Sequence, residues 1–125
     1  MKTVRLVAVS AVLLATLGGG KVWAGGKHAT IKGYIIDSSC TFTQDLNKPI
    51  SAECAVACAK AGSPLVIQGE NGTIYLPISG GMPATGQNDR LLAFAGQKVS
   101  VTGKVYVKGG AHAIVIDKIE GAPKP

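Results

Sequence analysis

The stretch Lys98–Lys108, KVSVTGKVYVK, decides the fold. Its alternate positions carry four valines and one glycine, namely Val99, Val101, Gly103, Val105 and Val107. Apolar and polar residues that alternate in this way are typical of an antiparallel strand with one buried face. Because a glycine in the middle of a strand marks a bend or bulge, Gly103 predicts a corner of a small barrel.

A tight turn follows this strand at Lys108-Gly109-Gly110, and Ala113 to Ile119 is the expected fifth strand. Upstream we expect three more strands, at Thr30–Asp37, Pro64–Gln68 and Thr73–Ile78. Glu70-Asn71-Gly72 predicts a hairpin turn between the second and third strands, because Asn-Gly tolerates positive φ at low cost. In the third strand, the apolar residues that share one face are Ile74, Leu76 and Ile78.

Two short helices complete the expected pattern. Ser51 can cap a helix over Ala52–Ala61, and Asn88 can cap another that runs to Phe94. We expect Ser38–Ile50 to be a polar loop. The order predicts a mainly β, five-stranded OB-like barrel, with one helix between strands three and four and another inserted between strands one and two. A five-stranded open sheet packed on helices is the alternative.

The first 24 residues predict a cleavable signal peptide. Lys2 and Arg5 precede an apolar run at Leu6–Leu17, and Val22-Trp23-Ala24 offers small residues to a signal peptidase. An uncleaved anchor is the alternative, but the run is shorter than the roughly 20 residues that span a bilayer. We therefore expect a periplasmic or secreted protein without an integral membrane anchor. It would have a flexible lead-in at 25–29, one domain at 30–120 and a disordered tail at 121–125.

The charge of the exported part is mild. The whole chain carries 13 basic and 7 acidic residues, a net charge of +6. Loss of Lys2, Arg5 and Lys21 leaves ten basic residues against seven acidic ones, a net charge of +3. Aromatic residues that stack on unpaired bases are also scarce, so we expect no nucleic-acid partner.

Three cysteines concentrate the chemistry of the chain. Cys40 follows the first strand, and Cys54 and Cys58 lie one turn apart on the same face of the predicted helix. Three thiolates can hold Cu(I) in trigonal geometry, or Zn(II) together with a fourth ligand. The candidate additional ligands are Asp37, His28 and His112. If cleavage exposed Gly26, the Gly26-Lys27-His28 terminus would offer a separate square-planar Cu(II) site.

The alternative use of the cysteines is one disulfide with one thiol left over. Cys40 can reach Cys54 or Cys58 more easily than these two can reach each other, because a bridge within one helical turn is strained. Such a bridge would pin the inserted helix to the barrel in a structural or interaction module. That module would bind another exported protein through the loop at 79–86 or the turn at 108–110.

The sequence gives little support for an enzyme. With two histidines, one of them close to the N-terminus, a Ser-His-Asp or Cys-His arrangement has few ways to assemble. The Cys-x-x-Cys motif of thiol redox proteins and the Cys-x-x-Cys-His motif of haem attachment are both absent. We therefore expect a binding protein whose ligand is copper or zinc.

The chain also resembles a group of small secreted bacterial proteins of uncharacterised function. The residues that carry the likeness are Asp37-Ser38-Ser39-Cys40, Glu53–Gly62 (ECAVACAKAG) and Val99–Val105 (VSVTGKV). In that group the cysteines recur in this arrangement, and the C-terminal half is also similar to periplasmic OB-fold proteins. The resemblance implies an OB-like fold and an extracytoplasmic location, and it implies no activity.

Overall fold

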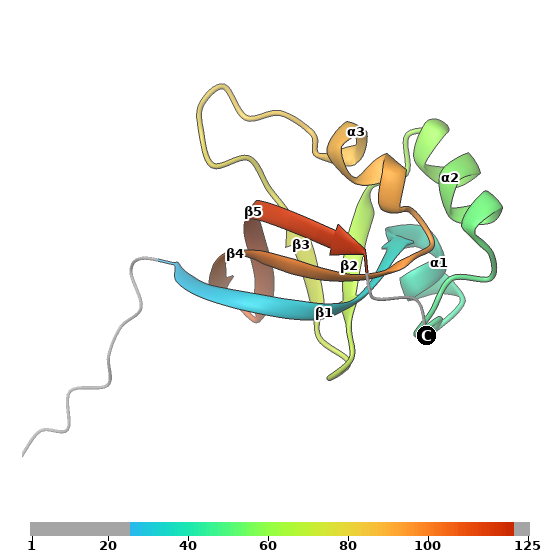
Figure 1. Cartoon of the computed structure of the whole chain (residues 1–125), viewed down its shortest axis with the longest axis horizontal. Coiled ribbons are helices and arrows are strands. Elements are labelled where there is room, and N and C mark those ends of the chain that lie inside the picture. The colour runs from blue at the N-terminus through green and yellow to red at the C-terminus, as the bar shows by residue number, and fades with distance from the viewer. Residues whose placement is uncertain (1–25, 122–125) are drawn as a thin grey trace, which may run out of the picture.

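Residues 26–121 are described by a computed structural model, in which strands and short helices alternate along the chain (Figure 1). The elements in chain order are β1 (Lys27–Asp37), α1 (Ser38–Thr43), α2 (Ala52–Lys60), β2 (Leu65–Gly69), β3 (Ile74–Pro77), α3 (Asn88–Leu91), the 3-10 helix η1 (Leu92–Phe94), β4 (Lys98–Lys108) and β5 (Ala111–Gly121). Within this part of the chain, no helix is both long and apolar enough to cross a bilayer. The predicted signal peptide at 1–24 and residues 122–125 of the predicted tail lie outside the described residues.

The five strands form a closed barrel in the order β1-β2-β3-β5-β4, and β4 returns to pair with β1. Every neighbouring pair is antiparallel except β3 and β5, which run parallel. A helical segment, α3 with η1, connects β3 to β4. The structure thereby confirms the predicted small OB-like barrel and rules out the open sheet.

Strand β1 closes the barrel because it pairs with β4 along its first part and with β2 along its second. Gly33 lies where the two pairings meet, opposite Gly69 of β2 and Val99 of β4. A side chain at Gly33 would collide with the backbone carbonyl of Gln68, so only glycine allows the strands to approach here. The long β4 also offers partners as far as Lys27, so Lys27–Ala29 form strand rather than the expected flexible lead-in.

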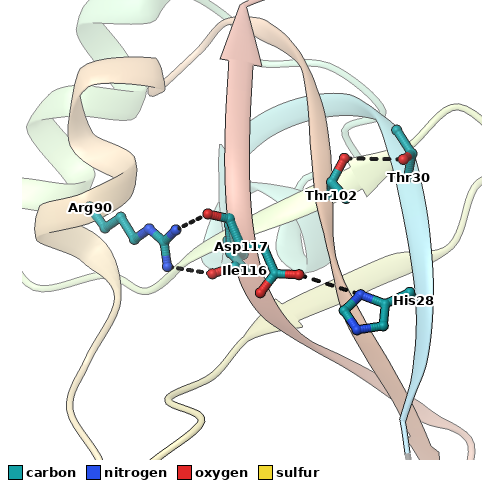
Figure 2. Close-up of polar contacts among 6 residues, drawn as sticks. All are labelled: His28, Thr30, Arg90, Thr102, Ile116 and Asp117. Carbon is teal, nitrogen blue, oxygen red and sulfur yellow. Dashed lines mark hydrogen bonds and ion pairs between the residues drawn. The ribbon is translucent and has the colours of Figure 1, made fainter.

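The bulge predicted at Gly103 is present and has a partner of its own. The register between β4 and β5 shifts between Thr102 and Gly103, and Asp117 is the extra residue on β5. The guanidinium of Arg90 in α3 donates to the carbonyl oxygens of Ile116 and Asp117, at 2.5 and 2.9 Å (Figure 2). One side chain therefore satisfies the carbonyls at the bulge and ties α3 to β5.

The interior of the barrel is aliphatic. The buried members of the core are Ile35, Ala55, Ala59, Leu65, Ile67, Tyr75, Leu91, Ala95, Val99, Val101, Ile114 and Ile116. On β3 the core residue is Tyr75, whereas Leu76 on the opposite face is 41% exposed. The face of the third strand that carries the aliphatic residues therefore points out of the barrel, because Tyr75 fills the interior.

The segment between β1 and β2, residues 38–64, is referred to below as the insert. Its two ends are neighbours, because Asp37 and Leu65 are register partners in the β1–β2 ladder. The expected polar loop at Ser38–Ile50 is wrong in its first half, where α1 occupies Ser38–Thr43. The helix expected at Ala52–Ala61 is confirmed as α2, and its alanines Ala55 and Ala59 join the barrel core.

Two residues outside the insert, Gly96 and Asn88, lie against α2 or the chain that follows it. Gly96 has a φ of 76°, and a side chain there would collide with Ala52 at the start of α2. Asn88 was expected to cap a helix, but Gln87 occupies the cap position of α3. The Asn88 amide instead accepts a hydrogen bond from the amide N of Leu65 at 2.9 Å and donates one to the carbonyl of Ser63 at 2.8 Å. Asn88 is thus a cross-link between α3 and the end of the insert.

Candidate metal centre

Two of the three cysteines lie in the first turns of capped helices. Asp37 is the N-cap of α1, and its carboxylate accepts a hydrogen bond from the amide N of Cys40 at 2.8 Å. Ser51 is the N-cap of α2, and its hydroxyl oxygen accepts one from the amide N of Cys54 at 3.0 Å. Because each cap bond ends on the cysteine's own amide, the caps fix the backbone from which both thiols project.

Cys58 follows one helical turn after Cys54 and completes a three-sulfur cluster. The three Sγ atoms all lie within 4.8 Å of one another. In a trigonal or tetrahedral site with metal–sulfur bonds of about 2.3 Å, neighbouring sulfurs are about 4 Å apart. A contraction of less than about 1 Å, within the reach of a χ1 adjustment, therefore brings the sulfurs to bonding distance of one ion.

All three cysteines are free thiols, and each is partly exposed. No disulfide joins any two of them in the described part of the chain. A cavity of about 10 Å³ adjoins two of them, and its lining comprises Ile36, Asp37, Cys40, Pro49, Ile50, Cys54 and Ala55. This volume is about the smallest that can hold one water molecule, so the space beside the sulfurs is of atomic size.

Desolvation and the carboxylate of Asp37 together favour the protonated form of two of the thiols, Cys40 and Cys58. Asp37 is only 1% exposed, and it also accepts a hydrogen bond from the Ser63 hydroxyl at 3.4 Å. Desolvation, then a hydrogen bond to Asp37 and its negative charge, raise the pKa of Cys40 to about 11. Desolvation and the charge of Asp37 also raise the pKa of Cys58. Both thiols are therefore protonated at neutral pH, which makes them weak nucleophiles and means that a metal must displace their protons.

The three candidate additional ligands do not join this cluster, which consists of the cysteines alone. Asp37 lies beside it, with its carboxylate engaged by the Cys40 amide and Ser63. His28 lies near the opposite end of β1 from the cluster. It precedes Asp37 by nine residues, which is about 30 Å of extended strand. Its side chain is 70% exposed and its Nδ1 lies 3.4 Å from the Asp117 carboxylate (Figure 2).

His112, at the start of β5, packs its ring edge-on against Tyr75 with the ring centroids 5.7 Å apart. The separate Cu(II) site predicted at Gly26-Lys27-His28 would use backbone nitrogens of Lys27 and His28, which belong to β1. Lys27 and His28 pair with Val105 and Lys104 of β4. A square-planar site built on their amides would require this end of the β1–β4 ladder to open.

Sequence reasoning identified the three cysteines and the Ser51 cap that positions Cys54, but it did not identify the Asp37 cap of α1 or the contribution of Asn88. The signal for α1 was present, because Asp37 stands three residues before Cys40 as an N-cap does. The contribution of Asn88 had no comparable signal, since its amide bonds to residues 23 and 25 positions away in the chain. Such long-range contacts have no fixed spacing in a sequence.

Comparisons of the chain with protein-family models, curated proteins and solved structures find no match. The resemblance of the cysteine pattern to small secreted bacterial proteins stays a prediction. What the chain offers for a functional argument is the cluster itself: three thiols within 4.8 Å, held by two helix caps and bordered by one buried carboxylate.

Proposed function

We propose that this chain is an exported protein that binds one soft metal ion, copper or zinc, through Cys40, Cys54 and Cys58. The observation that carries the proposal is the convergence of three thiols, from two helices, within 4.8 Å. Thiolates select soft and borderline ions such as Cu(I) and Zn(II) over the hard ions that prefer oxygen. Export rests on the signal-like pattern of residues 1–24 alone.

The protonation of the cluster supports a binding protein over a thiol enzyme. A catalytic cysteine is activated by a lowered pKa, whereas Asp37 and desolvation raise the pKa of Cys40 and Cys58. A metal ion supplies the positive charge that this negative surrounding lacks. Metal binding would release the thiol protons and place the ion close to the Asp37 carboxylate.

The test is the metal and thiol content of the full chain, expressed with its leader and purified from the extracytoplasmic fraction. We expect about one copper or zinc ion per chain, three titratable thiols after the metal is removed, and a mature N-terminus near residue 25. A mass deficit of two hydrogens with one free thiol would instead identify the disulfide module. If the protein stayed in the cytoplasm with its leader intact, export would be contradicted, while the metal site would not.

The cysteine variants Cys40→Ser, Cys54→Ser and Cys58→Ser are each expected to abolish metal retention through dialysis, because two thiols leave the ion under-coordinated. Met82→Leu is the matched control. It also removes a sulfur, but Met82 is 89% exposed and lies outside the three-sulfur cluster. Equal metal retention by the Cys58→Ser and Met82→Leu variants would contradict the assignment of the site.

A further inference from the structure

The cluster supplies three ligands and leaves a fourth position without a protein donor among the described residues. Asp37 borders the cluster without joining it, and its Oδ1 already accepts from the Cys40 amide and the Ser63 hydroxyl. Structural Zn(II) sites are almost always closed by four protein ligands. Cu(I) is stable with soft sulfur ligands alone, and three of them suffice. The donor set therefore favours Cu(I).

The place of the missing ligand is set by the small cavity beside the sulfurs. Cys40 and Cys54 line this cavity together with Pro49 and Ile50. Ile50 is 71% exposed, so this wall is a surface residue rather than part of the core. The cysteines are themselves partly exposed. An ion held beside these sulfurs would therefore lie close to the protein surface.

We propose, building on the metal-binding function above, that the site holds Cu(I) with an open coordination position beside Ile50, where an external soft ligand takes up the ion by direct exchange. The incoming donor forms its bond to copper before the cysteines leave. A thiol donor releases its proton to solvent as this bond forms, and each departing cysteine takes up a proton. Copper remains Cu(I) throughout, so no oxidant or reductant is needed.

This mechanism predicts how the rate of release depends on the acceptor. The full chain, loaded with one equivalent of Cu(I) without oxygen, is mixed with excess bicinchoninate, whose colour reports captured Cu(I). We expect the rate constant to rise linearly with bicinchoninate concentration. A rate independent of that concentration would show that the ion leaves unaided, which would overturn the exchange position while leaving the metal site intact. Failure of the chain to retain Cu(I) would overturn both.

A substitution at the cavity wall locates the open position. Ile50→Met places a thioether beside the ion, where it can act as the fourth ligand, and we expect exchange to slow by roughly tenfold. Val107→Met is the matched control, because Val107 is also exposed, at 61%, but lies on β4 and does not line the cavity. Equal rates for the two variants would overturn the placement beside Ile50.

Discussion

The β4–β5 hairpin and the insert are stabilised in different ways. The hairpin joins two strands of 11 residues through a two-residue turn, and its buried side chains are branched aliphatics. The insert contributes the small buried side chains of Ala55 and Ala59 to the core, with the half-buried Val56 packed against it. It depends instead on two helix caps, the cross-link from Asn88 and the contact with Gly96.

The difference follows from what each region does. A buried Val or Ile stabilises a fold by about 1.5–3 kcal/mol, whereas a cap contributes about 1 kcal/mol. The hairpin therefore carries the stability of the barrel, and the insert presents the thiols on a scaffold that is easier to perturb. This separation predicts that substitutions in the hairpin unfold the whole domain, while those around the insert act first on the proposed metal site.

The largest effect is expected from the core of the hairpin. Ile114 is fully buried, so Ile114→Ala should lower the free energy of unfolding by about 2–5 kcal/mol through lost burial and a cavity. Val107→Ala, at a 61% exposed position on the same hairpin, should change it by less than about 0.5 kcal/mol. Urea denaturation of the metal-free proteins measures both, and similar values would contradict the assignment of the core.

The next effect isolates the packing of α2 on the barrel. Gly96 and Gly72 both have positive φ, 76° and 85°, so alanine at either is strained by about 1–2 kcal/mol. Only at Gly96 does the added Cβ also collide with Ala52, whereas at Gly72 it meets nothing within 4 Å. We therefore expect Gly96→Ala to weaken metal binding and to destabilise the domain more than Gly72→Ala does. Equal metal affinities of the two variants, measured by chelator competition, would show that the contact between Gly96 and Ala52 does not affect metal binding.

Ser51 tests the insert alone. Removing its cap in Ser51→Ala should cost about 1 kcal/mol and fray the first turn of α2, so that Cys54 loses its fixed position. Ser51→Asn restores a side-chain cap and should restore metal affinity. Amide hydrogen exchange should quicken in residues 52–55 of the alanine variant and stay unchanged in β4 and β5. Faster exchange throughout the barrel would show that the two regions unfold as one unit.

The last effect is a pH dependence of the metal-free, reduced protein. The pKa of Cys40 is raised from 9.0 to about 11 in the folded state, so the folded chain holds its proton more tightly than the unfolded chain does. The associated stability is fully present below pH 9 and is lost as the pH rises towards 11. The slope should be shallower in Cys40→Ser, as urea midpoints across this range will show. Stability that increases over the same range would contradict the raised pKa of Cys40.

The same division separates what could be predicted from the sequence from what could not. The alternation of β4 and the glycine at 103 predicted a strand and its bulge, because both follow from local backbone geometry. The helix α1 was missed because its six residues, SSCTFT, have modest helix propensity, and the buried cap Asp37 and the β2 strand beneath it compensate. The burial of Tyr75 on β3 was not predicted, because either face of a short strand can be the buried one. Only the packing of the closed barrel determines which face lies inside.

The adjacency of Asp37 and Leu65 bears on the order of events during folding. The β4–β5 hairpin needs only two glycines to close, whereas pairing of β1 with β2 must first bring together the two ends of the insert. Closing a longer loop costs more entropy and slows the pairing that depends on it. Because α1 and α2 pack on β1 and β2, we expect the cysteine cluster to become fixed after that pairing. Under the proposed function, metal uptake is therefore expected late in folding.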